Sequence, residues 1–263
     1  DGRGTRQLRA NLRVVSGLEG EALDRLTGAA LRSYARYWQE AFRLPTIGPQ
    51  RIVDGTVVPG IEHLERCRAE GRGLVLALPH SGNWDAAGVW FVDWLRGPFY
   101  TVAERLRPES LYRRFLEYRE SLGMRVLPLT GGERPATEVL QEWLAGGGAT
   151  CLLVDRDLGG GGVPVTFAGR AATMPGGPAL LADRTGAGVF PVVCRFDGGG
   201  WRLVVHPEVP LDRGLGLRAR VTAAMQGVAD AFTASIAEQP EDWHVLGRIW
   251  ADVPPDPPRG ERR

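Results

Sequence analysis

The chain has 263 residues, 43% of them hydrophobic and 24% charged, which is enough apolar content for a substantial core in one or two domains. The formal net charge is +1, so no overall field selects a polyanion such as nucleic acid as the partner. All 32 basic residues are Arg. This excludes a P-loop lysine, a pyridoxal phosphate Schiff base and a lysine nucleophile.

The sequence holds three cysteines and no C-x-x-C pair. We therefore expect neither a disulfide framework nor a zinc site, and a reducing cytoplasm as the compartment. The longest apolar stretches, 74–79 and 86–95, are shorter than the roughly 20 residues that span a bilayer, so no membrane span is predicted. The chain begins at Asp1 rather than Met, and we expect native sequence, with room for an anchor, to precede it.

The N-terminal part of the chain has the pattern of helices. Between Glu21 and Phe42 the apolar residues recur at steps of three and four, which is helical spacing, and Pro45 and Gly48 are expected to end this helix. A second helix is predicted over about 59–70. Residues 1–72 are therefore expected to form a helical N-terminal segment.

Beyond residue 72 the pattern changes to short apolar runs separated by stretches long enough for helices. Strands are predicted over 74–78, 99–103, 125–129, 151–154, 189–196 and 201–206. Helices are predicted over 84–95, 109–122, 135–144, 175–185 and 218–238. This alternation predicts one α/β domain over 1–253, with a mostly parallel central sheet and helices on both faces, an α/β core over 73–253 and a disordered tail over 254–263. The glycines at 198–200 predict a hairpin that adds an antiparallel strand at one end.

The loop after the first apolar run offers the most chemistry. It reads Leu-Pro-His-Ser-Gly-Asn-Trp-Asp over 78–85, with His80 at a strand end and Asp85 where the next helix begins. Ser81 or Asn83 is expected to cap that helix. About one helical turn away, Asp85 would accept a hydrogen bond from one imidazole nitrogen and leave the other free to remove a proton. No G-x-S-x-G elbow occurs in the chain, so the nucleophile is expected to belong to the substrate.

Further polar residues follow later apolar runs. Glu104, Asp155 and Asp157 do so, and we expect them at the same rim of the sheet as His80. A strand-end acid is about as often a helix cap as a catalyst. A cluster of arginines forms either a solvated face or a binding surface for the phosphates of CoA or an inositol lipid. Its members are Arg105, Arg107, Arg113, Arg114 and Arg119.

Aromatic residues are concentrated beside the same loop. At least two of those on the following helix are expected to pack in the core, and the others to form an acyl groove or lie at lipid headgroup level with aromatic residues of the first long helix. The two sets are Trp84, Trp90, Phe91 and Trp94, and Tyr34, Tyr37, Trp38 and Phe42. Structural roles are expected for His63, His206 and His244.

Several ordered blocks resemble a known family. Besides the block over 78–85, they are TVAERLRPESLYRRF over 101–115, EYRESLG over 117–123, LPLTGGERP over 127–135, DRDL over 155–158 and DWHV over 242–245. Over about residues 8–250 the chain resembles the lipid A biosynthesis acyltransferase branch of the lysophospholipid acyltransferase superfamily. Two positions depart from its closest members: Asp155 stands in place of Glu, and Phe167-Ala168-Gly169 in place of Phe-Phe-Gly.

The resemblance implies a lysophospholipid acyltransferase-like fold. It also implies transfer of a long fatty acyl chain, with palmitoyl expected, from acyl-CoA to a mannose hydroxyl of a mannosylated phosphatidylinositol lipid. His80 would be the base, Asp85 its partner and Glu104 a further catalytic group. Substrate-binding roles are expected for Arg119, Asp155, Ser81, Asn83, Arg105 and Arg156. No metal or cofactor is expected beyond acyl-CoA as co-substrate, and the expected location is peripheral, on the cytoplasmic face of the plasma membrane.

Other functions fit the same residues. One is acyl transfer to another glycolipid or to a lysophospholipid. Another is acyl-CoA hydrolysis, in which His80 would activate water instead of a lipid hydroxyl. The third is a non-catalytic lipid-binding α/β protein, which would keep its binding when His80 is lost, whereas an acyltransferase would lose its activity.

Overall fold

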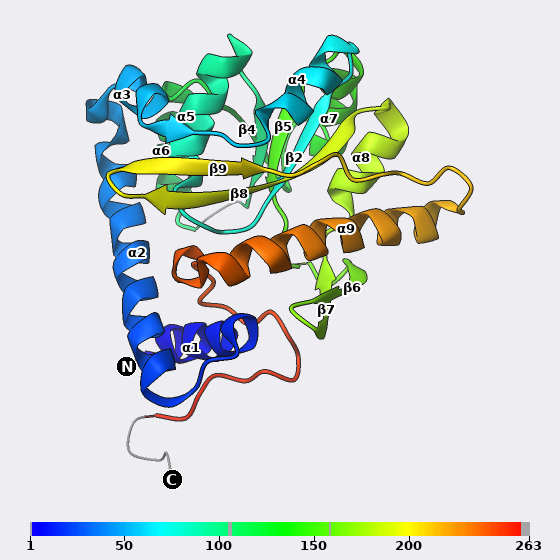
Figure 1. Ribbon diagram of the computed structural model, residues 1–263. Helices are drawn as coiled ribbons and strands as arrows, with labels where there is room; N and C mark the ends of the chain where they lie inside the picture. The colour runs from blue at the N-terminus through cyan, green and yellow to red at the C-terminus, as the bar shows by residue number, and fades with distance from the viewer. Residues whose placement is uncertain (1, 105–106, 158, 259–263) are drawn as a thin grey trace.

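The computed structural model describes residues 2–104, 107–157 and 159–258, and Figure 1 shows them arranged around a central sheet. The sheet has seven strands in the order β1-β9-β8-β2-β5-β3-β4. They are β1 (Thr56–Val57), β2 (Leu74–Leu78), β3 (Tyr100–Ala103), β4 (Arg125–Pro128), β5 (Ala149–Leu153), β8 (Gly188–Asp197) and β9 (Gly200–Val205). Every neighbouring pair is parallel except β8 with β9. This confirms the mostly parallel sheet and its antiparallel hairpin.

Helices cover both faces of the sheet because both faces of the central strands are apolar. In β2, the residues Leu74, Leu76 and Leu78 belong to the core formed with two helices, and Val75 and Ala77 belong to the core on the other face. The first face is covered by α4 (Ile61–Ala69) and α5 (Trp84–Leu95), and the second by α8 (Gly177–Thr185) and α9 (Leu217–Glu238). Two further helices, α6 (Glu109–Ser121) and α7 (Ala136–Ala145), also lie close to their predicted ranges.

The N-terminal helical segment is confirmed, with α1 (Arg3–Ser16), α2 (Gly20–Ile47) and α3 (Pro49–Asp54). The prediction that Pro45 ends the long helix is wrong, because α2 contains Pro45 and ends at Gly48 instead. Pro45 has no N–H to donate to the Ala41 carbonyl, so the helix lacks one hydrogen bond there, and only Thr46 and Ile47 follow before the helix ends. The sequence patterns also missed β1, α3 and a separate two-stranded hairpin of β6 (Val163–Phe167) and β7 (Arg170–Met174).

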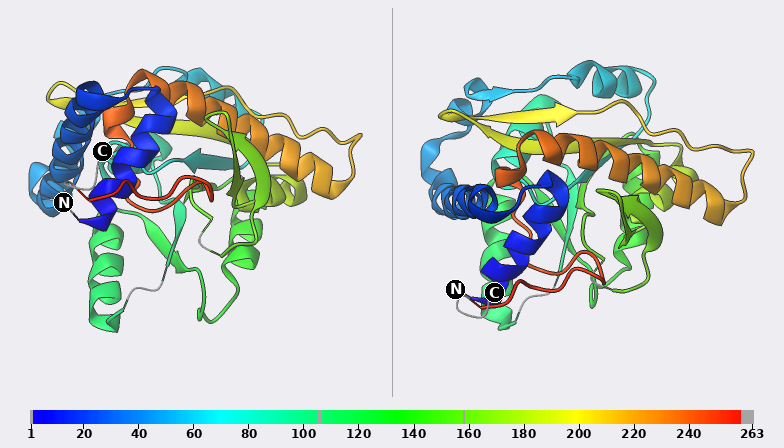
Figure 2. Two further views of the ribbon diagram at one scale, coloured as in Figure 1. Left: turned by 90° about the horizontal axis from the view of Figure 1, so that it is seen from below. Right: turned by 60° about the horizontal axis from the view of Figure 1, so that its bottom comes forward.

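The C-terminal segment lies beside α1, as Figure 2 shows. The Asp256 carboxylate pairs with the guanidinium groups of Arg9 and Arg13, and the Asp256 N–H donates to the Arg6 carbonyl at 3.3 Å. Residues 254–258 belong to the expected disordered tail, and this buried ion pair joins them to the N-terminal helix. The rest of the expected tail lies outside the described residues.

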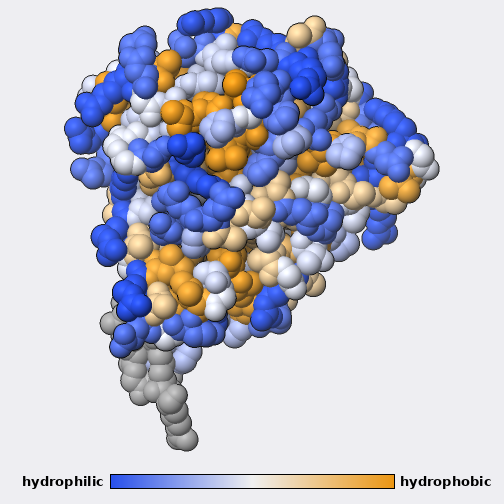
Figure 3. All heavy atoms as spheres, in the orientation of Figure 1, coloured by the Kyte–Doolittle hydropathy of each residue, from blue (hydrophilic) through white to orange (hydrophobic). Residues whose placement is uncertain are grey.

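Figure 3 shows that hydrophilic side chains cover most of the face seen in Figure 1. Apolar side chains gather in two areas of this face, one above β9 and one between α9 and α1. Such limited areas are usual for a folded protein surface, because there is never enough polar surface to cover it entirely.

Candidate active site

The register of two parallel strands brings His80 and Asp155 together. Leu78 of β2 is aligned with Leu153 of β5, and each strand is followed two residues later by a polar side chain, His80 or Asp155. Imidazole Nδ1 lies 2.6 Å from Asp155 Oδ1, and the His80 main-chain N–H donates to Asp155 Oδ2 at 2.9 Å. The two groups form a histidine–carboxylate pair at the carboxyl ends of the strands, where α/β proteins place their ligands.

Asp155 is held as an anion in a dry environment. Its side chain is fully buried, and a third donor, the Trp243 indole N–H, reaches Oδ2 at 2.9 Å. Burial by itself raises the pKa of the carboxyl group. The charge of His80 and the hydrogen bonds from His80 and Trp243 outweigh that effect and lower the pKa of Asp155 below its ordinary value.

This pairing leaves one nitrogen of His80 available for chemistry. Because Nδ1 faces Asp155, the neutral ring carries its proton on Nδ1 and presents the lone pair of Nε2. Nε2 has no hydrogen-bond partner among the described residues, and the side chain remains 23% exposed. The ring is packed edge-on to Trp84, with 5.6 Å between ring centroids. His80 can therefore accept a proton from a bound hydroxyl or water.

The predicted partnership of His80 with Asp85 is wrong. Asp85 accepts hydrogen bonds from Tyr37 Oη and from Arg119 Nε, each at 3.0 Å. The prediction assumed helical spacing between the two residues. Asn83 caps α5, so His80 lies outside the helix and Asp85 within its first turn, and the two side chains point to different partners.

Asp85, Arg119 and Tyr37 form a second polar cluster. The side chains of Asp85 and Arg119 are 2% and 18% exposed. Burial disfavours the charge of Arg119, yet Asp85 and Tyr37 raise its pKa overall. Burial and the negative charge of Asp85 raise the pKa of Tyr37 well above its ordinary value. The cluster is an ion pair that fixes α5 against α2 and α6, and the two Arg119 Nη groups form no hydrogen bond with the described residues.

Ser81 and Asn83, for which substrate-binding roles are expected, are both buried. Asn83 Oδ1 accepts the Ala86 N–H at 2.9 Å, and its amide donates to Glu40 at 2.8 Å. Ser81 is 2% exposed and forms an isolated antiparallel bridge with Trp243. Both residues hold the loop that carries His80, and Asn83 is confirmed as the helix cap.

The structure does not join the other predicted residues to the His80–Asp155 pair. Glu104 follows β3, is exposed, and has no hydrogen bond or ion pair with any described residue. Arg156 follows Asp155 directly and is likewise without an ion pair among the described residues, with its guanidinium near Gly247. Arg105 lies outside the described residues.

Sequence reasoning missed two groups that complete the site. One is Tyr37, whose hydroxyl donates a hydrogen bond to Asp85. The sequence placed it only among aromatic residues. The other is the segment Asp242–His244: the Gly82 N–H donates to the Asp242 carbonyl and the His244 N–H to the His80 carbonyl, each at 2.8 Å. The Asp-Trp-His-Val block was a signal for this segment, although nothing in the sequence indicated its contact with the His80 loop.

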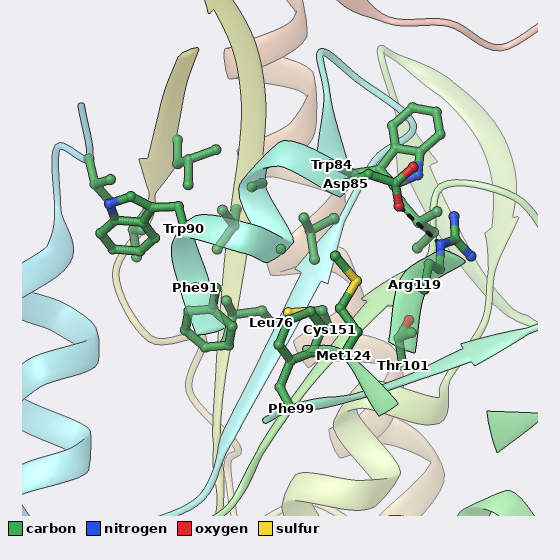
Figure 4. Close-up of a pocket in the computed structure, with 18 of the residues that line it drawn as sticks. Leu76, Trp84, Asp85, Trp90, Phe91, Phe99, Thr101, Arg119, Met124 and Cys151 are labelled. Carbon is green, nitrogen blue, oxygen red and sulfur yellow. Dashed lines mark hydrogen bonds and ion pairs between the residues drawn. The ribbon is translucent and has the colours of Figure 1, made fainter. Parts of the chain in front are cut away.

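An apolar pocket lies between α5 and the sheet, next to the histidine loop. Figure 4 shows the Asp85–Arg119 pair and Trp84 at one end of it and Phe91, Phe99 and Met124 away from that end. Other lining residues include Leu76, Leu78, Ala87, Gly88, Trp90, Cys151, Leu153, Val192 and Leu203. A pocket that is apolar along its length and polar at one end suits a hydrocarbon chain with a polar head.

The described ranges contain no helix that is both long and apolar enough to cross a bilayer. In the same ranges, no group of three or more His, Cys, Asp or Glu side chains is arranged to hold a metal ion.

A strand-end histidine held by a buried carboxylate beside an apolar pocket is suited to proton transfer on a lipid-like substrate. The chain belongs to the bacterial lipid A biosynthesis acyltransferase family, whose model matches residues 1–252. This confirms the resemblance stated from the sequence and defines the protein as an acyltransferase.

Two curated relatives are similar along nearly all of the chain. The phosphatidylinositol mannoside acyltransferase of Mycolicibacterium smegmatis (strain ATCC 700084 / mc(2)155) is 55% identical over 248 residues, covering 94% of this chain and 80% of that protein. The phosphatidylinositol mannoside acyltransferase of Mycobacterium tuberculosis (strain ATCC 25618 / H37Rv) is 50% identical over 250 residues, covering 94% of this chain and 77% of that protein.

Proposed function

We propose that this protein transfers a long fatty acyl chain, palmitoyl in the first instance, from acyl-CoA to a mannose hydroxyl of a phosphatidylinositol mannoside. The observation that carries the proposal is the His80–Asp155 pair, with Nδ1 engaged at 2.6 Å, next to a pocket lined by apolar side chains. The names of the two mycobacterial relatives support the acceptor. The pocket supports a fatty acyl donor.

In the proposed reaction His80 is a general base and then a general acid. The acceptor hydroxyl oxygen forms a bond with the thioester carbonyl carbon while its proton passes to His80 Nε2. The tetrahedral intermediate then collapses, the carbon–sulfur bond breaks, and the CoA sulfur takes the proton from Nε2. Asp155 holds the ring in one tautomer and stabilises the imidazolium. Protons and electrons balance without an acyl-enzyme, because the acceptor itself is the nucleophile.

The remaining polar groups are proposed to bind charged parts of the substrates. The free Nη groups of Arg119 are in the pocket wall, where they would meet the thioester carbonyl or a phosphate. Arg156 directly follows Asp155 in the chain and forms no ion pair with any described residue. It is therefore proposed to contact a phosphate of CoA or of the inositol lipid. Glu104 is proposed as a further catalytic group, and Arg105, which lies outside the described residues, as a substrate contact.

One assay tests the activity directly. Purified protein is incubated with palmitoyl-CoA and phosphatidylinositol mannosides, and both free CoA and the acylated lipid are followed by mass spectrometry. Equal amounts of the two products support transfer. Release of CoA without acylated lipid would assign the protein as a thioesterase, and acylation of a different lipid in parallel reactions would replace the acceptor.

The His80→Ala variant tests the base. Loss of the base is expected to lower turnover by about 10²–10⁴, while circular dichroism and the melting temperature stay near those of the wild type. A folded His80→Ala variant with wild-type product formation would remove His80 from the mechanism. A protein that binds lipid equally well with and without His80 but never forms product would be a non-catalytic binding protein.

Direct transfer without a metal is tested separately. Treatment with EDTA is expected to leave the rate unchanged. The intact mass of the protein after mixing with palmitoyl-CoA alone is expected to stay the same. An added acyl mass that disappears when acceptor is supplied would establish a covalent intermediate and overturn the scheme.

A peripheral position on the membrane is proposed because the acceptor is a lipid. On α2 the residue Phe42 is 79% exposed, and its ring stacks with that of Trp38, with 6.0 Å between ring centroids. Arg43 is exposed beside it. An aromatic side chain with a neighbouring arginine suits an anionic interface. Tyr37 is buried at 3% exposure and is assigned to the core instead.

Vesicle flotation tests this position. Phe42→Ser is expected to weaken binding to vesicles that contain phosphatidylinositol, and high salt is expected to weaken it further. Leu217→Ser is the matched control, because Leu217 is also exposed, at 47%, at the start of α9. Equal binding of both variants and the wild type would remove α2 from the membrane face.

A further inference from the structure

We infer that Trp243 is a positioning residue for the proposed base, holding the Asp155 carboxylate with its indole N–H and the His80 loop with its main chain. The inference rests on the proposed function, because Trp243 would act through the His80–Asp155 pair. It adds Trp243 to that proposal, a residue 88 positions after Asp155 whose side chain donates to Asp155 and not to His80.

The hydrogen bonds of Asp155 show what the indole contributes. Oδ1 faces His80 Nδ1, and Oδ2 accepts two donors, the His80 main-chain N–H and Trp243 Nε1, each at 2.9 Å. The Asp155 side chain is fully buried, so water does not replace a donor that is lost. A carboxylate with one donor fewer in a dry site is a poorer anion and holds a proton more tightly.

The main chain around Trp243 holds the same loop. Residues 242–244 and 80–82 lie antiparallel, with hydrogen bonds from Gly82 N–H to the Asp242 carbonyl and from His244 N–H to the His80 carbonyl, each at 2.8 Å. Between them Ser81 and Trp243 form the bridge. The indole and the loop are therefore fixed relative to each other, and the distance from Trp243 to Asp155 is set by this short ladder.

The position of Trp243 is itself held firmly. Its side chain is fully buried, with ring centroids 5.7 Å from Phe167 and 6.0 Å from Trp250. The preceding Asp242 carboxylate accepts the Phe196 N–H at 2.7 Å. A side chain locked by packing and by its neighbour's hydrogen bonds can hold a reacting pair in one geometry.

The other titratable groups near the pair do not compete with this effect. His244, on the same segment, has its pKa lowered to about 3 by burial and by the charge of His80, so it stays neutral near neutral pH. Asp85 on α5 is paired with Arg119. Arg156 follows Asp155 in the chain, and its guanidinium lies near Gly247.

The Trp243→Phe variant tests the inference. It keeps a ring in the aromatic cluster but removes the N–H. We expect the acid limb of the pH–kcat profile to move up by about one pH unit, because the proton added to the His80–Asp155 pair is held more tightly. We also expect kcat at neutral pH to fall by about tenfold as the imidazole loses its fixed orientation.

Trp250→Phe is the matched control. Trp250 is also fully buried and in the same aromatic cluster, but its N–H donates to the Phe167 carbonyl at 3.0 Å and not to the site. The control is expected to lose stability to a similar extent while its acid limb stays in place. If Trp243→Phe does not fold, benzothienylalanine at position 243 supplies the shape of the indole without its N–H.

Side-chain nitrogen NMR of His80 in the protein without substrate gives a readout independent of activity. The wild type is expected to show one neutral tautomer with the proton on Nδ1, and the folded Trp243 variant a mixture of tautomers. Unchanged His80 nitrogen shifts together with an unchanged acid limb would overturn the inference. An active His80→Ala variant would instead overturn the proposed function, and a tautomer mixture in the Trp243 variant would still support positioning.

Discussion

Asp85 and Asp155, the two aspartates beside the loop that carries His80, are both buried but have different hydrogen-bond partners. Asp155 accepts from His80 and Trp243 and keeps the imidazole in one tautomer. Asp85 accepts from Tyr37 and Arg119 and ties three helices together. The short motif that contains His80 and Asp85 therefore joins the proposed base to a residue that holds helices together.

Asparagine substitutions separate these roles. Asp155→Asn is expected to lower kcat by about 10³–10⁴, because an amide does not enforce the correct imidazole tautomer. Asp85→Asn is expected to lower the melting temperature first, because Arg119 loses its counter-charge. Steady-state kinetics and thermal unfolding are measured on both variants, and a smaller kcat loss for Asp155→Asn than for Asp85→Asn would contradict the assignment.

Arg119 is expected to contribute mainly to stability. Arg119→Ala leaves the Asp85 carboxylate buried without its counter-ion, which is expected to lower the free energy of unfolding by about 2–4 kcal/mol. The Asp85→Asn, Arg119→Gln double variant is expected to recover part of this loss, since it buries no unpaired charge. Urea unfolding of the wild type and of these variants measures the free energy of unfolding. Unchanged stability with a raised KM for one substrate would leave Arg119 with its proposed substrate contact alone and contradict its role in stability.

At the scale of elements, α5 forms one wall of the apolar pocket and comes very close to the loop before β4. A Cβ at Gly88 would lie 2.3 Å from Met124 Cε and 3.3 Å from Phe99 Cζ. The end of a methionine side chain can move away, and the pocket is the open space next to it. The missing side chain at Gly88 therefore leaves room for Met124 at the end of the proposed acyl site.

Gly88→Ala is expected to shorten the preferred acyl chain by about one or two methylene groups, because the displaced Met124 would fill that length of the pocket. Relative rates with acyl-CoAs of 12 to about 18 carbons measure the shift. Met124→Ala is the reciprocal variant and is expected to favour longer chains and to restore palmitoyl transfer in the double variant. An unchanged chain-length profile in all three variants would place the acyl chain elsewhere.

At the scale of the whole molecule, the N-terminal helix α1 is bound to the segment around residues 245–256. Beyond the Asp256 ion pairs, Asn11 of α1 donates to the carbonyls of Val245 and Gly247 at 2.9 Å each. The same C-terminal stretch contains Trp243 and His244, which contact the histidine loop. The N-terminal helix therefore supports the active-site segment from outside the sheet.

The buried His244 is expected to make stability depend on pH. Burial lowers its pKa from 6.5 to about 3, so the unfolded chain binds a proton that the folded protein excludes. His244 does not lower the free energy of unfolding above pH 6.5. As the pH falls further below 6.5, the free energy of unfolding decreases by about 1.4 kcal/mol per pH unit. Urea unfolding between pH 7.5 and about 5 measures the slope. His244→Phe is expected to reduce the dependence of the free energy of unfolding on pH below pH 6.5 and to leave that dependence unchanged above pH 7. An identical pH dependence in the variant would exclude His244 as its cause.

The sequence by itself determined six of the seven strands of the central sheet, most of the helices, the fold class and the placement of His80 at a strand end. These follow from local patterns, because hydrophobic periodicity depends on residues a few positions apart. It also placed Glu104 and Asp155 at the same rim of the sheet, but it named Asp85 as the carboxylate partner of His80, and that prediction is wrong.

Only the tertiary structure decided that partner. The strand order puts β5, and not β3, beside β2, and the register then aligns Asp155 with His80. The ladder that brings Trp243 to the pair joins segments about 160 residues apart. Such contacts come from the packing of whole elements against one another, and a periodic pattern contains no information about which elements become neighbours.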